Sequence, residues 1–298
     1  MSQSKVLGSK VMGLDFDVSV CAQSKVVKDL DQAHSGATLD LRLHKGQILV
    51  CKRMPATDRS WRCLKKQKEF LPLDKVSAVE VLSSNAVSGE VEVLMPLTRG
   101  VVGVEYITSL SVEEVNSFSS ALSSLLLRSQ NEAIHSSSQH HLITAKIEEL
   151  RANHTVPKSY RLLLKHLDLK IKTIPSFRIG TCHGDLTLGN MIFEKDTGRL
   201  QLIDFLDTYI ESPLIDLAKL EQDLVFGWSS RYENPEVRLR AKIFGAHVFD
   251  TIKILDAQDE KLFNIIRVLN TLRILPYCKD STTEEWVRFV VTQQEQIL

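Results

Sequence analysis

Four polar side chains suited to acid–base or metal chemistry fall within one short window of the sequence. The window begins with His183 and Asp185. Asn190 follows five residues after Asp185, and Asp204 follows nineteen residues after it. Carboxylates accept protons, and carboxylate and amide oxygens are ligands that Mg²⁺ prefers. A hydrophobic core needs no such set beside apolar segments, so the window is a candidate reaction site.

Two short apolar segments place these side chains relative to one another. Met191–Phe193 and Leu200–Ile203 flank an Asp-Thr-Gly turn, which predicts a β-hairpin. Asn190 stands at its entrance and Asp204 at its exit, so we expect the two to be neighbours that bind Mg²⁺ together with phosphate and water. Asp185, one loop earlier, could accept a proton from a substrate hydroxyl. The set predicts phosphoryl transfer to an alcohol.

The first hundred residues are predicted to form strands and one helix. Gly46 supplies a hairpin turn, Asp58 is expected to cap the helix, and Pro96 is expected to end the last strand. The predicted strands are Val18–Cys21, Lys25–Lys28, Leu39–Leu43, Gln47–Lys52, Ala78–Leu82 and Glu90–Met95. A turn is expected at Asn85–Gly89, between the last two.

This strand-rich part contains residues that could bind phosphate. Lys52 ends an apolar strand, and Glu69 lies seventeen residues later on the predicted helix. Such a pair can aim the ammonium at a phosphate, whereas Lys52 taken alone is interpreted as a solvated lysine. The polar loop 31–37, with Ser35 and Gly36, could place backbone N–H groups on phosphates. With a single glycine in the loop, an ordinary hairpin loop is the better interpretation from these residues alone.

The rest of the chain is predicted to be mainly helical. Ser111 and Glu114 form a capping-box pattern at the start of a helix that runs to about residue 128. Asp216 lies at the start of a later helix, which it is expected to cap. Further helices are predicted at 142–152, 158–168, 235–257, 259–273 and 282–297. Strands first and helices later predict an α+β fold with two lobes, residues 1–97 and 98–298.

Composition restricts the class of protein. Formal net charge is zero, which gives no bulk attraction to nucleic acid or to an anionic membrane. No apolar run reaches the ~18 residues of a membrane span, and the first residues lack the apolar core of a signal peptide. Five scattered cysteines with no CxxC pair argue against disulfides or a zinc site. We expect a cytoplasmic protein with no nucleic acid, membrane or obligate protein partner.

The motifs resemble those of the aminoglycoside phosphotransferase and choline kinase family, which has a protein-kinase-like fold. Gly184 stands where protein kinases usually have arginine, and Leu206 replaces the glycine that follows their Asp-Phe. Pro213–Ala218 is similar to the family's Pro-x-x-Asp-Leu-Ala element, and no Ala-Pro-Glu activation segment is present. The resemblance follows the whole chain in order and is specific from about 181 to 220.

The resemblance implies a bilobal kinase-like fold, with a small β-rich nucleotide-binding N-lobe and a larger, mainly helical C-lobe for catalysis and acceptor binding. It also implies ATP and Mg²⁺ as cofactors. The implied roles are Asp185 as base; Asn190 and Asp204 as Mg²⁺ ligands; Lys52, held by Glu69, with Ser35 and Gly36 on the nucleotide phosphates; Met95 and Leu97 in the hinge beside adenine; and His183 and Asp216 as supports of the loop.

The acceptor is the least readable part of the sequence. Trp228, Arg231 and Tyr232 could stack on a sugar or enclose a quaternary amine, or could be core residues. Asp207 is either an exposed loop acid, the interpretation we favour, or a further metal or substrate contact. A polycationic antibiotic would need clustered acids, and only Asp256–Glu260 offers them.

A small-molecule hydroxyl acceptor is therefore expected, with a neutral or anionic sugar or sugar derivative first. Choline or an amino alcohol comes second and an aminoglycoside third. A protein kinase and a nucleotide-binding pseudokinase scaffold are the alternatives from other classes. The missing activation segment counts against a protein kinase.

Overall fold

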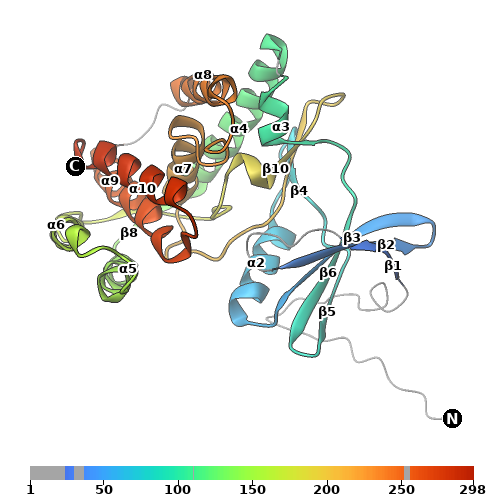
Figure 1. The fold of residues 1–298 in the computed structure, drawn as a ribbon, viewed down its shortest axis with the longest axis horizontal. Helices are drawn as coiled ribbons and strands as arrows, with labels where there is room; N and C mark the ends of the chain where they lie inside the picture. Colours follow the sequence, from blue (N-terminus) through green and yellow to red (C-terminus); the bar gives the residue numbers. More distant parts are fainter. Residues whose placement is uncertain (1–23, 30–36, 110, 252–255) are drawn as a thin grey trace. The chain divides into compact units, whose positions relative to one another are not determined.

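The computed structural model describes residues 24–29, 37–109, 111–251 and 256–298, and the chain divides into two compact units (Figure 1). The first unit comprises Met1–Gly100 and Gln201–Asp207, and the second comprises Val101–Leu200 and Thr208–Leu298. The segment 201–207, expected in the second lobe, is part of the first unit. The predicted strand Val18–Cys21 lies outside the described residues.

The first unit is built on a five-stranded antiparallel sheet in the order β1-β2-β3-β6-β5. Two-residue turns at Lys45–Gly46 and Ser88–Gly89 have positive φ at both positions, as tight hairpins require. The predicted turn at Gly46 and the end of the last strand at Pro96 are confirmed. The strands are β1 (Lys25–Asp29), β2 (Thr38–His44), β3 (Gln47–Pro55), β5 (Ser83–Val87) and β6 (Glu90–Pro96).

The predicted strand Ala78–Leu82 is wrong. A short strand, β4, covers Val76–Ala78, and the partner of β6 is the polar segment Ser83–Val87. The turn at Ser88–Gly89 pairs Val87 with Glu90, which brings Ser83 opposite Leu94. Register in a hairpin is fixed by the turn, and here it overrides the apolar pattern that favoured the earlier residues. The turn is correspondingly shorter than the predicted Asn85–Gly89.

Helix α2 (Asp58–Glu69) lies against one face of this sheet (Figure 1). Its cap is Thr57, whose Oγ1 accepts from Ser60 N at 3.2 Å, and not Asp58 as predicted. Asp58 occupies the first turn, where a negative charge favours the helix dipole. Trp61 and Leu64 pack into a core with Val79, Val81, Val91, Val93 and Met95.

A buried network of ion pairs joins the sheet strands. Asp40 of β2 is fully buried, and its carboxylate lies 2.8 Å from Arg42 Nε and 3.0 Å from Arg53 Nη2 of β3. Arg42 also pairs with Glu92 of β6 at 2.7 Å. Removing one partner of such a network leaves an uncompensated charge in a low-dielectric interior.

We predict that Asp40→Asn destabilises the first unit by about 3 kcal/mol, because two guanidinium groups lose their shared carboxylate. The measurement is thermal unfolding of the full chain with a spectroscopic probe of β-structure. Asp74→Asn, at an exposed position of the same unit, is the matched control and should unfold like the parent. Equal midpoints for both variants would contradict the prediction.

The second unit is mainly helical, and a helix is present in each region where the sequence predicts one. The predicted helix 235–257 corresponds to α8, described to Thr251; residues 252–255 lie outside the described residues, and residue 257 begins α9. The capping box at Ser111 and Glu114 is confirmed by reciprocal hydrogen bonds of 3.2 and 2.7 Å. The helices are α3 (Gly103–Ile107), α4 (Val112–Glu132), α5 (His140–Ala152), η1 (Lys158–Tyr160), α6 (Arg161–Ile171), η2 (Leu188–Asn190), α7 (Pro213–Leu220), η3 (Glu221–Val225), α8 (Pro235–Thr251), α9 (Ala257–Leu272), η4 (Leu275–Tyr277) and α10 (Ser281–Glu295).

Short strands accompany these helices. In the second unit β7 (Val101–Val102) pairs with β10 (Met191–Glu194), and β8 (Ile134–Ser136) pairs with β9 (Phe177–Ile179). The turn after β10 is closed by a hydrogen bond from Gly198 N to Glu194 O at 2.9 Å. Strand β11 (Arg199–Leu202) follows that turn, with the bounds that the sequence predicted to within one residue.

Aromatic rings packed in tilted and edge-on arrangements form the core around β10. The centroid of the Phe193 ring lies 4.3 Å from that of Tyr106 in α3 and 5.2 Å from that of Phe118 in α4. The Phe118 and Phe244 ring centroids are 5.0 Å apart, and Phe244 belongs to α8. All four side chains are almost fully buried. At the start of α3, a Cβ on Gly103 would lie 2.8 Å from Leu188 O, so only glycine allows this approach. The core thus fixes the end of the loop that precedes β10.

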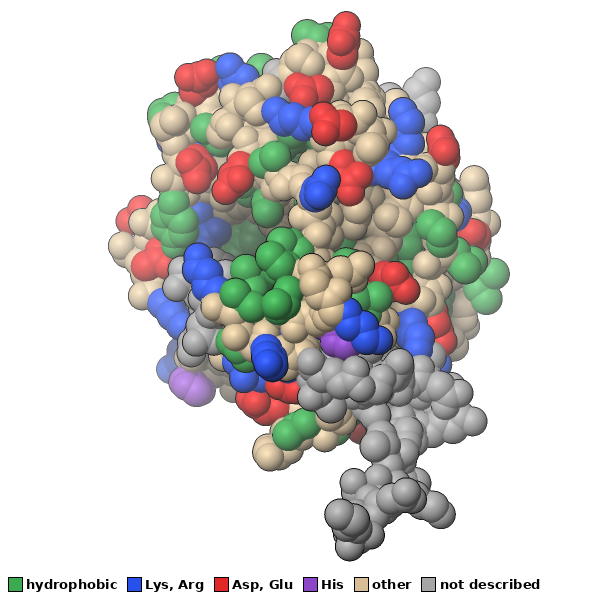
Figure 2. Space-filling view, turned by 90° about the vertical axis from the view of Figure 1, so that its right-hand side faces the viewer, with side chains coloured by type: hydrophobic (Ala, Val, Ile, Leu, Met, Phe, Trp, Pro, Cys, Tyr) green, Lys and Arg blue, Asp and Glu red, His purple; other side chains and the backbone are tan. Residues whose placement is uncertain are grey.

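Acidic and basic side chains are interspersed on the face shown in Figure 2. Within the ranges that the structure describes, no helix combines the length and apolar character of a membrane span. None of the four described cysteines forms a disulfide.

Candidate active site

The loop between β9 and β10 carries three of the predicted site residues and is held by one carboxylate. Asp216 of α7 is 3% exposed, and its two oxygens accept from His183 N at 2.7 Å and Gly184 N at 2.8 Å. Gly184 has a φ of 90°, a conformation that strains any residue with a side chain. Asp216 therefore braces the loop. It does not cap α7, because Ser212 Oγ accepts from Leu214 N at that helix end.

His183 also supports the loop from within. Its side chain is buried, and its Nδ1 accepts a hydrogen bond from Asp185 N at 3.2 Å. An acceptor Nδ1 implies that the ring proton resides on Nε2. The imidazole thereby fixes the backbone beside the carboxylate of Asp185.

Each oxygen of the Asp185 carboxylate has a fixed donor. Asn190 Nδ2 lies 3.0 Å from Oδ2 and also donates to Asp185 O at 2.8 Å, while Lys219 Nζ lies 3.0 Å from Oδ1. The Asp185 side chain remains 32% exposed. Burial acts to raise the pKa of Asp185, but the Lys219 ammonium and the other donors outweigh it and hold the pKa below its ordinary value. The structure therefore holds an ionised carboxylate at Asp185 whose orientation is fixed.

Sequence reasoning missed two residues of this arrangement, Lys219 and Asp223. Asp223 is fully buried in η3, and its oxygens accept from Leu188 N at 2.5 Å and Ser229 N at 2.6 Å. Burial raises the pKa of Asp223. The hydrogen bonds from the Leu188 and Ser229 amides oppose this rise, and the negative charge of Asp185 adds to it. A polar stripe at 216, 219 and 223, with helical spacing, was the signal available in the sequence.

The helix changes character where it leaves the loop. Residues Glu221–Val225 form a π-helical turn that continues α7 directly. Such turns are rare and frequently accompany functional sites. Here the wider turn presents Asp223 to both Leu188 and Ser229, so it joins the loop to the segment 226–232.

In the first unit, Lys52 is paired with Asp204. Lys52 Nζ lies 2.5 Å from Asp204 Oδ1, and the Asp204 side chain is 38% exposed. Asp204 has a φ of 59°. The other described non-glycine residues with positive φ, Lys45 and Ser88, both lie in hairpin turns, whereas Asp204 does not. A strained backbone at an acidic side chain is typical of a functional position.

The expected ion pair between Lys52 and Glu69 is wrong, because Lys52 pairs with Asp204 instead. Glu69 is the last residue of α2, more than half exposed, and lies 3.9 Å from Lys65 Nζ on its own helix. The buried residue of that last turn is Gln67, whose Nε2 donates to Val79 O at 2.8 Å. The helix therefore turns Glu69 towards solvent, while Lys52 pairs with Asp204.

The other predicted site residues of the first unit differ in their exposure and in their contacts. Asp207 is not the exposed loop acid we favoured, because its carboxylate pairs with Arg62 Nη2 at 2.9 Å and is 21% exposed. Met95 is buried in the core, and Leu97 is half exposed. Ser35 and Gly36 lie outside the described residues, so their nucleotide roles stay predictions, as do those of Met95 and Leu97.

The predicted acceptor residues form a stack in the second unit. The Arg231 guanidinium lies 3.8 Å from the Trp228 ring and 4.4 Å from the Tyr232 ring. Trp228 contacts Trp286 at 5.1 Å, and Tyr232 Oη is 2.9 Å from Asp280 Oδ2. These contacts hold the segment together, and an acceptor role for it stays a prediction.

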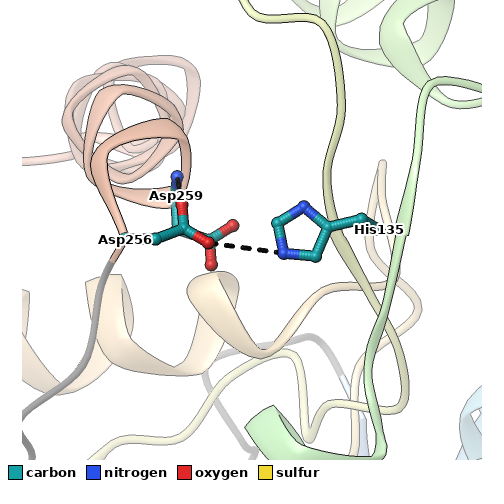
Figure 3. Close-up of side chains that lie close together, drawn as sticks. All are labelled: His135, Asp256 and Asp259. Carbon is teal, nitrogen blue, oxygen red and sulfur yellow. Dashed lines mark hydrogen bonds and ion pairs between the residues drawn. The ribbon is translucent and has the colours of Figure 1, made fainter.

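One group of side chains has the composition of a metal site. His135, Asp256 and Asp259 offer ligand atoms within 4.8 Å of one another, and Figure 3 shows the imidazole facing both carboxylates. Arg178 Nε already lies 2.7 Å from Asp259 Oδ2, and His135 lies 3.4 Å from Asp256. A guanidinium in that position repels a cation, so we interpret the group as ion pairs that tie β8 and β9 to α9.

Comparison with known proteins agrees with the resemblance seen in the motifs. Residues 119–244 match the profile of the phosphotransferase enzyme family. This range contains the loop at 183–190, Asp204 and the stripe on α7 and η3. Among curated protein sequences, none matches the chain. The expected class, an ATP-dependent phosphotransferase acting on a small molecule, is confirmed at the level of this family match.

Solved structures share the fold at low sequence identity. A thermostable mutant of aminoglycoside phosphotransferase APH(4)-Ia, complexed with AMP-PNP and hygromycin B, is 13% identical with a TM-score of 0.62 over 92% of this chain and 93% of that chain. APH(2″)-IIIa with GDP and kanamycin is 14% identical, with a TM-score of 0.58 over 94% of both chains. A candidate fructosamine-3-kinase of Haemophilus somnus 129PT is 12% identical, with a TM-score of 0.57 over 96% and 93%. The expected kinase-like α+β fold is confirmed.

A separate cavity is lined by residues of η3, α8 and α9. Its volume is about 490 Å³, and its lining comprises Glu221, Val225, Lys242, Ala246, Phe249, Asp250 and Phe263. Glu221 pairs with Arg267 at 3.0 Å, and its Oε2 is buried with no hydrogen bond from the described part of the chain. Burial raises the pKa of Glu221 from 4.5 to about 7, although the Arg267 charge opposes the rise.

This pKa predicts a pH dependence of stability. Between 4.5 and about 7 the folded protein keeps a proton on Glu221 that the unfolded chain has released, so stability falls as pH rises through this window. The loss is at most roughly 3 kcal/mol. Glu221→Gln should flatten the fall in melting temperature between about pH 5 and about pH 8. Glu233→Gln, on the exposed surface, is the control and should keep the parent slope; equal slopes in both variants would refute the assignment.

Proposed function

We propose that this chain transfers the γ-phosphoryl group of Mg·ATP to a hydroxyl of a sugar or sugar derivative, with Asp185 as the base. The observation that carries the proposal is the Asp185 carboxylate, one-third exposed and fixed by Asn190 and Lys219 on a loop braced by Asp216. An acid that serves only structure has no need of exposure to a reactant. A base needs a fixed direction and an open side.

The donor set fits a magnesium ion. Asn190 uses Nδ2 for its two hydrogen bonds, which leaves the amide oxygen as its remaining ligand atom. Asp204 contributes a partly exposed carboxylate. Hard oxygen ligands of this kind suit Mg²⁺, which when bound would neutralise phosphate charge. That Asn190 and Asp204 act on the same ion is part of the proposal.

The chain's own residues would then carry out proton transfer and orientation. Asp185 accepts the proton of the acceptor hydroxyl as the new O–P bond forms and the bond to the departing ADP oxygen breaks. Lys52, which pairs with Asp204, would contact the nucleotide phosphates. His183 and Asp216 hold the backbone and do not react.

A sugar is our first choice of acceptor for two reasons. The cluster at Asp256–Glu260 that could attract a polycation is already neutralised in part, because the Arg178 guanidinium lies 4.0 Å from Asp256 and 2.7 Å from Asp259. The likeness to a candidate fructosamine-3-kinase adds a fold relative named for a sugar derivative. Choline, an amino alcohol or an aminoglycoside is the alternative substrate, and a pseudokinase scaffold is the alternative from another class. Cytoplasmic location stays a prediction.

We predict that Asp185→Ala lowers phosphoryl transfer by at least about 1,000-fold while Mg·ATP affinity stays within about threefold, because the base touches the acceptor and not the nucleotide. Asp204→Ala should instead weaken Mg·ATP binding itself. Calorimetric titration and turnover assays measure the two effects. Asp196→Ala, in the exposed turn after β10, is the control. Full turnover by Asp185→Ala would exclude its role as base.

A transfer screen identifies the acceptor. Purified protein, Mg·ATP and panels of sugars, amino alcohols and aminoglycosides are monitored for ADP formation and for phosphorylated product. We expect product from the sugar panel. Product from another panel would reassign the substrate, and tight Mg·ATP binding without product from any panel would favour the scaffold.

A further inference from the structure

Lys219 is in contact with the carboxylate proposed as the base. It lies on α7, one turn after Asp216, on the side that faces the loop. Its Nζ lies 3.0 Å from Asp185 Oδ1, and its side chain is 14% exposed. Asn190 fixes the other oxygen of the same carboxylate at 3.0 Å. The carboxylate therefore has one neutral donor and one cationic donor, each from a different element.

This pairing differs from the surface ion pairs of the same unit. Lys172 and Asp168 pair at 2.6 Å along α6, but the lysine is 61% exposed, as is usual for a pair of helical neighbours. Lys219 is enclosed, its partner is 34 positions away in the sequence, and that partner keeps an exposed side. An enclosed ammonium beside an exposed carboxylate directs its charge to the place where an acceptor would bind.

We propose that Lys219 is a positioning residue for phosphoryl transfer, which fixes the orientation of Asp185 and places a positive charge beside the attacking oxygen. The inference rests on the proposed function of Asp185. When an acceptor hydroxyl donates its hydrogen bond to Asp185, its oxygen comes within a few ångströms of the ammonium. The ammonium keeps its own proton throughout, and the hydroxyl proton passes to Asp185.

The position of the charge also bears on the class of acceptor. An acceptor with an ammonium next to its reactive hydroxyl would bring two like charges together in a partly enclosed site, which is unfavourable. A neutral hydroxyl, or one beside a carboxylate or phosphate, meets no such repulsion. Lys219 therefore favours neutral or anionic alcohols and disfavours amine-bearing ones at the reacting position.

The test compares Lys219→Met, Lys219→Arg and Lys165→Met, the last an exposed lysine on α6. We expect Lys219→Met to lower kcat by about 100-fold while KM for Mg·ATP changes less than about threefold, since the charge acts on the transition state. Lys219→Arg keeps the charge and should restore kcat to within about tenfold of the parent. Lys165→Met should behave as the parent.

The readouts separate this inference from the proposed function. Transfer is measured with the acceptor from the screen and with water, as slow hydrolysis of Mg·ATP, beside the affinity for Mg·ATP and the melting temperature. Parent protein that transfers phosphate to neither would defeat the proposed function. An active parent whose Lys219→Met variant keeps its kcat, or loses kcat and melting temperature together without rescue by arginine, would overturn the role of Lys219. A shift of Lys219→Met towards amine-bearing alcohols would support it.

Discussion

The two hydrogen bonds from the loop backbone to Asp216 are the constraint on which the candidate site depends. A buried carboxylate that accepts two amide N–H groups forms charge-assisted bonds, which are stronger than neutral ones and have no water to compete with them. They fix the peptide units on both sides of His183, which sets the direction in which the chain continues to Asp185. Helix α7 packs against α4 and α9, so the position of the Asp185 carboxylate is set by the core of the second unit.

The same helix face continues this function beyond Asp216. Lys219 reaches the side chain of Asp185, and Asp223 holds the far end of the loop at Leu188. The continuous helical segment of α7 and η3 thus contacts the loop at His183 and Gly184, at Asp185 and at Leu188. A site held on a rigid helix needs no reorganisation when charge develops, which is the condition for effective electrostatic stabilisation.

Local chemistry made much of the fold predictable. The capping box at Ser111, the turn at Gly46 and the end of a strand at Pro96 depend on residues within a few positions, so the sequence contains the whole signal. The register of β5 against β6 was not predictable in this way, because the turn at Ser88–Gly89 outweighed the apolar pattern and the paired strand begins at Ser83. The helix caps at Asp58 and Asp216 were misassigned for a related reason: Thr57 and Ser212 precede them and are equally good acceptors.

The partners in the site were harder to predict than its members. Asp185, Asn190 and Asp204 have a recognisable spacing, whereas Lys219 and Asp223 become informative only once α7 is placed beside the loop. Lys52 likewise was assigned a glutamate on the next helix, and it pairs with Asp204, more than a hundred positions away. Which ion pairs form depends on tertiary placement, and a helix end such as Glu69 turns to solvent as readily as inward.

The shared carboxylate of Asp223 has a consequence for how this architecture can diversify. Leu188 and Ser229 both donate backbone N–H groups to this side chain, so loss of the carboxylate would leave two buried amides unpaired, one in the loop that carries Asp185 and one in the aromatic segment after η3. A chimera that takes residues 213–231 from another chain would therefore have to keep an acceptor at position 223, because the loop 183–190 depends on it as well. Recombination within this fold is constrained by a hydrogen bond that neither sequence segment reveals by itself.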